Sequence, residues 1–134
     1  MNFEKTETQT EAQINELTSK IIGAAVEVHK ILGPGLLESA YQAALAHELR
    51  LRNIAFEEQK FCPVVYKDHV IENAYRLDFL VEGAVVVELK TVDKLTDVHE
   101  AQVLTYLKFT GSHIGLLFNF NSTILTKGMR RLAL

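Results

Sequence analysis

Only one cysteine, Cys62, occurs among the 134 residues of this sequence. A single cysteine excludes an internal disulfide and a zinc site built on cysteines, so its expected role is that of a small buried apolar side chain. Long apolar runs are also missing, and the longest, residues 85–87 and 114–118, are far too short to cross a bilayer. The polar N-terminus lacks the apolar core of a signal peptide. These absences predict a cytoplasmic protein.

An excess of positive charge is missing as well, since the formal net charge is −3. Strong nonspecific binding of nucleic acid usually needs a basic face, so the negative net charge argues against such binding. It does not decide the matter, because carboxylates reserved for a metal would account for part of the acidity. The length allows a single domain. We expect a flexible N-terminus over residues 1–10 and one domain over residues 11–134.

The spacing of apolar residues predicts an α/β fold. Apolar residues recur every three or four positions over residues 11–32 and 36–52, which indicates two amphipathic helices separated by Gly33-Pro34. The remaining predicted elements are strands at 61–66, 71–81, 84–92 and 113–121, a third helix at 97–110, and a weaker closing element at 124–132. Three meander strands, a crossover helix and a return strand predict a mixed sheet flanked by helices.

Two local details are also predicted. The strand at 71–81 should alternate, with Ile71, Asn73, Tyr75, Leu77, Phe79 and Val81 on one face and Glu72, Ala74, Arg76, Asp78 and Leu80 on the other. Asp97 should open the third helix, with Glu100 as its capping-box partner.

Three polar residues stand on the predicted strands 71–81 and 84–92, and the second of these strands, the most apolar, should lie centrally in the sheet. Glu88 and Lys90 lie two positions apart, so their side chains project to the same face of the strand. Charged groups on a buried face are costly unless a partner of opposite charge or hydrogen bonds offset the loss of water. If the hairpin loop has an odd length and is centred on Gly83, or contains a bulge, Asp78 lies opposite Glu88 and the three side chains converge. Two carboxylates with waters and a phosphate oxygen suit Mg²⁺, which would help deprotonate a water while lysine stabilises charge on the phosphate. The alternative is an ion pair at a strand end beside a satisfied edge carboxylate.

Two further patterns bear on this choice. Gln102 and Tyr106 share one face of the third helix. The alternative is that they are an ordinary glutamine at the helix boundary and an ordinary core tyrosine, which would have the same spacing. Gly35, Glu38 and Tyr41 stand at three-residue spacing, although Glu38 also suits the positive end of a helix dipole and Tyr41 suits the core. A second E-x-K triplet at residues 58–60 has no upstream aspartate on a paired strand, and we discount it.

The segment LGPGLLESAY, followed by RLDFLV, VVVELK and QVLTY, resembles the small bacterial and archaeal GxxExxY proteins of the PD-(D/E)xK nuclease superfamily. The resemblance covers about residues 14–134. It implies a restriction-endonuclease-like αβββαβ core with an extra N-terminal helix, and a glutamate on the first core helix that helps to hold a metal or its water. The matching residues are Gly35, Glu38 and Tyr41 for GxxExxY, Asp78, Glu88 and Lys90 for the metal-binding aspartate and E-x-K, and Gln102 and Tyr106 for the QxxxY motif of RecB-like nucleases.

The leading functional hypothesis is therefore a Mg²⁺- or Mn²⁺-dependent phosphodiesterase that acts on DNA, with RNA less favoured. In it Asp78, Glu88 and the Leu89 carbonyl hold the metal, Glu38 positions water or a second ion, Lys90 assists the nucleophile, and Gln102 and Tyr106 orient the substrate. A second hypothesis is a non-cleaving module that keeps the fold and binds nucleic acid or a protein partner. A third treats the polar residues as structural. The small size is compatible with a homodimer or a partner protein.

Four other sites carry weaker expectations. His29 could approach the site as a ligand, but an ordinary helix-end histidine is favoured. His99 could face phosphate, but a solvated helix-start residue is favoured. Arg76 could pair with Asp78 or contact a phosphate. The basic cluster could touch a nucleic-acid backbone, but a solvated terminal face is favoured; its members are Lys127, Arg130 and Arg131.

Overall fold

The computed structural model describes residues 9–134. Along the chain the elements are α1 (Glu11–Leu32), α2 (Glu38–Leu51), β1 (Phe56–Tyr66), β2 (His69–Val81), β3 (Val85–Lys90), α3 (Asp97–Thr110), β4 (Ile114–Asn119), the 3₁₀ helix η2 (Leu125–Gly128) and β5 (Met129–Ala133). The expected order of elements is confirmed, and the weak closing element is a 3₁₀ turn followed by a strand. The expected flexible segment 1–10 lies, except for Gln9 and Thr10, outside the described residues.

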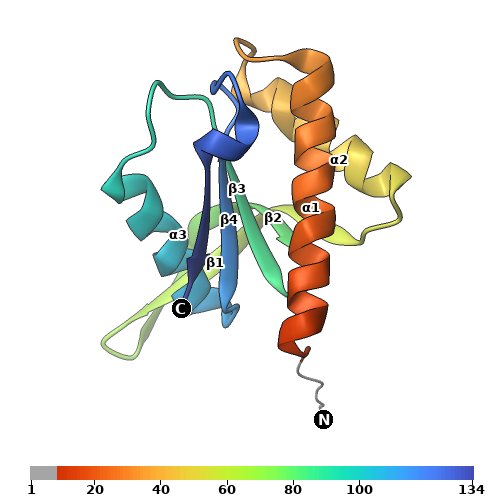
Figure 1. The fold of residues 1–134 in the computed structure, drawn as a ribbon. Coiled ribbons are helices and arrows are strands. Elements are labelled where there is room, and N and C mark those ends of the chain that lie inside the picture. Colours follow the sequence, from red (N-terminus) through yellow and green to blue (C-terminus); the bar gives the residue numbers. More distant parts are fainter. Residues whose placement is uncertain (1–8) are drawn as a thin grey trace.

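The five strands form one mixed sheet in the order β1-β2-β3-β4-β5. Neighbouring strands run antiparallel except for β3 and β4, which are parallel and are joined by the crossover through α3. In Figure 1, α1 and α2 cover one face of the sheet and α3 covers the other, while the hairpin of β1 and β2 projects past the sheet. This arrangement is a restriction-endonuclease-like α/β fold, as the sequence predicts.

Two apolar clusters hold these layers together. The larger one packs α1 and α2 against the side chains of β3 and β4 that face them, including Val85, Val87, Leu89, Leu116 and Phe118. The smaller one packs α3 against the opposite face, through Leu80, Val86, Val103, Leu107 and Leu117. Because β3 and β4 are covered on both faces, they read as continuous apolar runs in the sequence.

The helices begin and end mostly where sequence signals place them. Thr10 caps α1 by accepting the Gln13 amide, 3.1 Å away, and Gly33 ends the helix with a positive φ of 70°. The predicted cap of α3 is wrong, because Thr96 is the extended residue before the helix and the His99 ring accepts the Thr96 amide at 3.0 Å. Asp97 is already helical, and Glu100 is instead free to pair with Arg130 on β5, with an N–O distance of 3.5 Å.

Some expected core positions are exposed. Ile31 at the end of α1 is 70% exposed, and Leu37 is 78% exposed because it precedes α2 rather than lying on its buried stripe. The second helix therefore starts two residues later than predicted, at Glu38. The first strand begins at Phe56, five residues earlier than predicted, because β1 is a largely polar strand at the edge of the sheet. Cys62 is buried, as expected.

The prediction that Leu77 and Phe79 share one face of β2 is also wrong. Leu77 packs in the cluster beneath α3, whereas Phe79 packs in the cluster beneath α1 and α2. The register of β1 with β2 shifts between Cys62 and Val64, and Asn73 takes a left-handed φ of 51°. Closer to Asp78, Gln59 lies between the β1 partners of Leu77 and Phe79 and takes a left-handed φ of 53°, and the β2–β3 pairing ends at Phe79, where the side chains change face.

No helix within residues 9–134 has the length and apolar character needed to cross a membrane.

Candidate active site

The site lies where β2 and β3 separate. Their paired residues end with Phe79 opposite Val87, one step before Asp78 and Glu88 would face each other. The loop between the strands has three residues centred on Gly83, whose φ is +65°, so the odd loop required by the sequence argument is present. Beyond this point side chains replace the backbone ladder.

Asp78 and Glu88 join β2 and β3 by reciprocal hydrogen bonds, in which each carboxylate accepts a backbone N–H of the other strand. The Asp78 backbone N–H donates to Glu88 Oε1 at 3.1 Å, and the Leu89 N–H donates to Asp78 Oδ2 at 2.8 Å. The structure therefore brings the two carboxylates to one place, and it places the Leu89 backbone beside them.

The electrostatics of Glu88 are far from those of an ordinary carboxylate. Its side chain is 4% exposed. Burial, followed by the charge of Asp78 and a side-chain hydrogen bond with it, raises the pKa of Glu88 to about 9, although the Asp78 N–H and the Lys90 ammonium act in the opposite direction. A buried carboxyl with this pKa holds a proton at neutral pH unless a further positive charge is present.

Glu38 approaches from the first turn of α2. The pKa of its carboxyl is raised by burial and by the charge of Asp78, and lowered by Lys90. Glu38, Asp78, Glu88 and Lys90 are therefore close enough to influence one another, with Glu38 contributed by a helix and the other three by two strands. Two of these residues, Asp78 and Lys90, are half-buried.

The G-x-x-E-x-x-Y segment explains how Glu38 reaches this position. Gly35 turns the chain with a φ of +103°. The buried Tyr41 hydroxyl donates to the Gly33 carbonyl at 2.5 Å and accepts the Leu36 N–H at 3.2 Å, which fixes the loop before α2. The Tyr41 ring stacks on Phe120, with 4.7 Å between centroids, so the loop is anchored to the sheet. The tyrosine thus has both the core role and a local structural role.

The two residues of the α3 motif differ in their placement. Tyr106 is buried and stacks on Tyr75, with ring centroids 4.6 Å apart. Burial, and then the charges of Glu88 and Asp78, raise the pKa of Tyr106 to about 12, so its phenol lies on the side of the carboxylates. Gln102 is exposed, and its side chain makes no hydrogen bond with another described residue.

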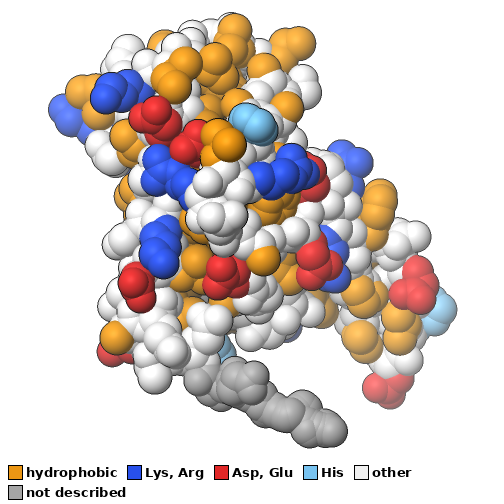
Figure 2. All heavy atoms as spheres, turned by 90° about the vertical axis from the view of Figure 1, so that its right-hand side faces the viewer, with side chains coloured by type: hydrophobic (Ala, Val, Ile, Leu, Met, Phe, Trp, Pro, Cys, Tyr) orange, Lys and Arg blue, Asp and Glu red, His pale blue; other side chains and the backbone are white. Residues whose placement is uncertain are grey.

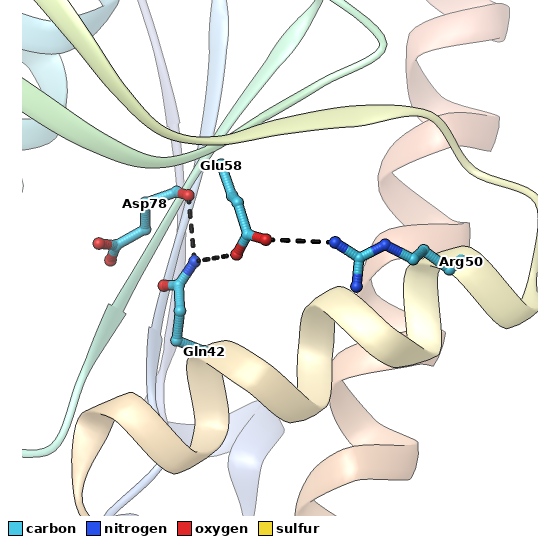
Figure 3. Close-up of polar contacts among 4 residues, drawn as sticks. All are labelled: Gln42, Arg50, Glu58 and Asp78. Carbon is cyan, nitrogen blue, oxygen red and sulfur yellow. Dashed lines mark hydrogen bonds and ion pairs between the residues drawn. The ribbon is translucent and has the colours of Figure 1, made fainter.

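Sequence reasoning missed Gln42, one helical turn after Glu38. Its Nε2 donates to the Asp78 carbonyl at 3.3 Å and to Glu58 Oε2 at 3.2 Å, while Arg50 pairs with Glu58 at 3.2 Å. Figure 3 shows that this network fastens the backbone of Asp78 and leaves the aspartate carboxyl pointing away from Gln42. Glu58 belongs to the discounted E-x-K triplet, whose Lys60 pairs with Glu57 instead. A signal for Gln42 exists only in its i+4 spacing from Glu38.

Asn119 at the end of β4 was also missed. It is buried, its Nδ2 donates to the Val92 carbonyl at 2.8 Å, and its Oδ1 accepts the Val92 N–H at 3.1 Å. This double hydrogen bond fixes the chain just after Lys90.

The weaker candidates are mostly engaged elsewhere. His29 is buried and donates from Nε2 to the Ser122 carbonyl at 2.7 Å, in keeping with a structural histidine. His99 caps α3 rather than standing free in solvent. Arg131 donates to Asn15 and Thr18 on α1, and Arg130 pairs with Glu100, so the terminal basic cluster is largely used within the chain. Arg76 forms no ion pair with Asp78.

The carboxylates of Asp78 and Glu88 are chemically suitable ligands for a hard divalent cation. Two carboxylates, one of them buried and with a raised pKa, are oxygen ligands that a positive charge between them would stabilise. No group of three or more histidine, cysteine, aspartate or glutamate side chains within residues 9–134 is arranged to hold a metal. A cation here would therefore need backbone and water oxygens to complete its shell, which is ordinary for Mg²⁺.

Fold and site together define the nuclease-type α/β domain in which an aspartate and an E-x-K triplet meet on neighbouring strands. The family model described as the PD-(D/E)XK nuclease superfamily matches residues 15–132, and the chain belongs to this superfamily. Comparison with curated proteins and with solved structures gave no significant match. Membership indicates a nuclease-type function.

Proposed function

We propose that this chain is a metal-dependent nuclease that hydrolyses phosphodiester bonds of nucleic acid, with DNA as the expected substrate. The observation that carries the proposal is the reciprocal contact of Asp78 and Glu88 where the sheet opens, with Lys90 and Glu38 beside them. We also infer that the chain is one of the GxxExxY proteins, since Gly35, Glu38 and Tyr41 each have a role in forming this site.

The cation would be Mg²⁺ or Mn²⁺, held by Asp78, Glu88 and the Leu89 carbonyl. When bound, such an ion lowers the pKa of a water and offsets charge on phosphate oxygens.

The remaining work falls to side chains of this protein. Glu38, at the start of α2, accepts a hydrogen bond from the attacking water and orients it toward phosphorus. The Lys90 ammonium stabilises negative charge as it grows on the phosphate. Tyr106 donates a hydrogen bond from its phenol, whose pKa of about 12 lies well above neutral pH. Gln102, exposed on the same helix, contacts the substrate strand.

A cleavage assay tests the proposal. Single- and double-stranded DNA and RNA are incubated with Mg²⁺ or Mn²⁺ and the parent protein, Glu88→Ala or Lys90→Ala. We expect metal-dependent cleavage by the parent and its loss in both variants, with the fold checked by circular dichroism. Variants that cut as fast as the parent would show that these residues are not the active site.

The alternative is a catalytically silent nuclease-fold module that binds nucleic acid or a protein partner. The absence of a three-residue ligand cluster within residues 9–134 favours it. Oligonucleotide binding without cleavage of any of the four substrates, at millimolar Mg²⁺ and Mn²⁺, would support this alternative.

A further inference from the structure

Arg76 differs from the other arginines in what its side chain contacts. Arg50, Arg52 and Arg130 pair with glutamates, and Arg131 donates to Asn15 and Thr18. The guanidinium of Arg76 forms no hydrogen bond or ion pair with another residue in the described range 9–134. It is exposed on β2, two residues before Asp78.

The guanidinium of Arg76 lies over an exposed aromatic ring. Phe61 on β1 is the register partner of Arg76, and the guanidinium carbon is 5.7 Å from its ring centroid. Phe61 is nevertheless 56% exposed. A large ring left this open, with a cation at its face, is a surface on which another flat group can stack.

The two faces of the projecting hairpin have different surroundings. Its neighbouring residues Cys62, Tyr75 and Leu77 pack in the cluster with Tyr106 and Leu107 of α3. Phe61 and Arg76 stand clear of that cluster. Figure 1 shows the hairpin projecting past the sheet on the side of α3, and Figure 2, viewed from the side of α1, shows hydrophobic side chains open to solvent on a lobe that lies farther from the viewer.

A groove connects Arg76 to the candidate active site. It has a volume of about 360 Å³ and is lined by Glu38, Ser39, Gln42, Gln59, Arg76 and Asp78. The exposed arginine and the two carboxylates therefore line the same concavity, and Phe61 lies against Arg76 without being part of the lining.

We propose that Phe61 and Arg76 bind a single strand of nucleic acid next to the cleaved bond, with an unpaired base stacked on Phe61 and a phosphate held by Arg76. This inference rests on the proposed function, whose substrate class it narrows. The formal net charge of −3 argues against the broad phosphate neutralisation on which duplex binding depends. An aromatic platform beside one cation is the combination that single strands use, because stacking needs an exposed base.

Binding is measured by fluorescence anisotropy in EDTA, so that no cleavage occurs, with one labelled oligonucleotide as a single strand and as its duplex. The full chain carries Phe61→Ala or Arg76→Gln. A matched control comes from the hairpin turn, where Lys67 lies 5.4 Å from the exposed ring of Tyr66. Tyr66→Ala and Lys67→Gln remove the same chemistry away from the groove. Thermal melting checks that all four exposed substitutions leave the fold intact.

We expect the single strand to bind more tightly than the duplex. Phe61→Ala and Arg76→Gln should each weaken single-strand binding about tenfold. Arg76→Gln should also reduce the slope of log affinity against log salt by about 0.7, whereas Phe61→Ala leaves the slope unchanged because no phosphate contact is lost. The two turn variants should bind as the parent does.

The proposal is overturned by equal or tighter duplex binding, by no detectable single-strand binding, or by parent-like affinity in both groove variants. This outcome differs from failure of the nuclease assignment. Cleavage that survives in the parent while the groove variants bind normally refutes the strand-binding site alone. Single-strand binding that depends on Phe61 and Arg76, with no cleavage under any metal, refutes the nuclease activity and leaves the binding site standing.

Discussion

The raised pKa of Glu88 predicts that the metal-free protein loses stability as pH increases. In the unfolded chain this carboxyl ionises near its ordinary pKa of 4.5, whereas in the folded protein it keeps its proton up to about 9. Between these values the folded state binds more protons than the unfolded state, so the free energy of unfolding decreases with pH. The stability that Glu88 contributes is complete below pH 4.5 and disappears as pH passes through 9.

The magnitude follows from the linkage between protonation and folding. Each pH unit inside this window removes about 1.4 kcal/mol, so an increase from about pH 5.5 to about pH 7.5 removes about 2 to 3 kcal/mol. For a domain of this size that corresponds to a decrease in melting temperature of about 10 °C.

Glu88→Gln is the informative variant because its neutral amide copies the protonated carboxyl and does not titrate. It can still accept the Asp78 N–H that Glu88 accepts at 3.1 Å. Urea unfolding of both proteins in EDTA, at the two pH values, gives the free energies. All other titratable groups are common to both proteins, so their contribution cancels. We expect the variant to gain about 2 to 3 kcal/mol on the parent between the two pH values. Parallel pH profiles would refute the argument that Glu88 is held protonated.

Three other predictions follow from the contacts around the site. Millimolar Mn²⁺ should raise the melting temperature of the parent, by an amount worth about 2.7 kcal/mol at a hundredfold excess over Kd, and should leave Glu88→Ala unchanged; an equal shift in both would place the ion elsewhere. Tyr41→Phe removes the hydroxyl that bridges Gly33 and Leu36, so urea unfolding should show a loss of about 1 to 3 kcal/mol, and an unchanged midpoint would contradict a structural role for that hydroxyl. Asn119→Ala leaves the N–H and the carbonyl of Val92 without their partner, so the free energy of unfolding should decrease by about 2 to 3 kcal/mol in the same assay. Stability equal to that of the parent would contradict this role of Asn119.

The sequence predicts the order of elements because the local signals are strong. Gly33 and Gly111 end helices with positive φ, and the apolar strands β3 and β4 differ clearly from their surroundings. The start of β1 is not predicted, because residues 56–60 are mostly polar and form a strand by pairing with β2, whose residues come some twenty positions later. The cap of α3 is not predicted, because the Thr96 N–H donates to the ring nitrogen of His99. The neighbouring Asp97 and Glu100 match the usual capping pattern more closely and so favour the wrong cap.

The candidate site is predictable where its residues share a strand or a hairpin. Glu88 and Lys90 follow from strand geometry, and Asp78 follows from the odd loop at Gly83. Gln42 and Asn119 do not follow, since their partners lie far away along the chain and their own positions look like ordinary polar residues. The change of face near Asp78 does not follow either, because it depends on how β1 and β3 pair with β2.

The shortness of the β2–β3 ladder has a dynamic consequence. These strands share three residue pairs, whereas β1 accompanies β2 over most of its length. Beyond these pairs, the outer hairpin is held by its packing against α3 and by side chains at the strand junction, including the contacts of Gln42 on α2 with Glu58 and Asp78. Its amide protons should exchange through local opening faster than those of β3 and β4, which are flanked on both sides. If the proposed strand-binding site exists, such opening would move a bound nucleotide toward or away from Asp78 and Glu88 while β3, β4 and β5 stay paired.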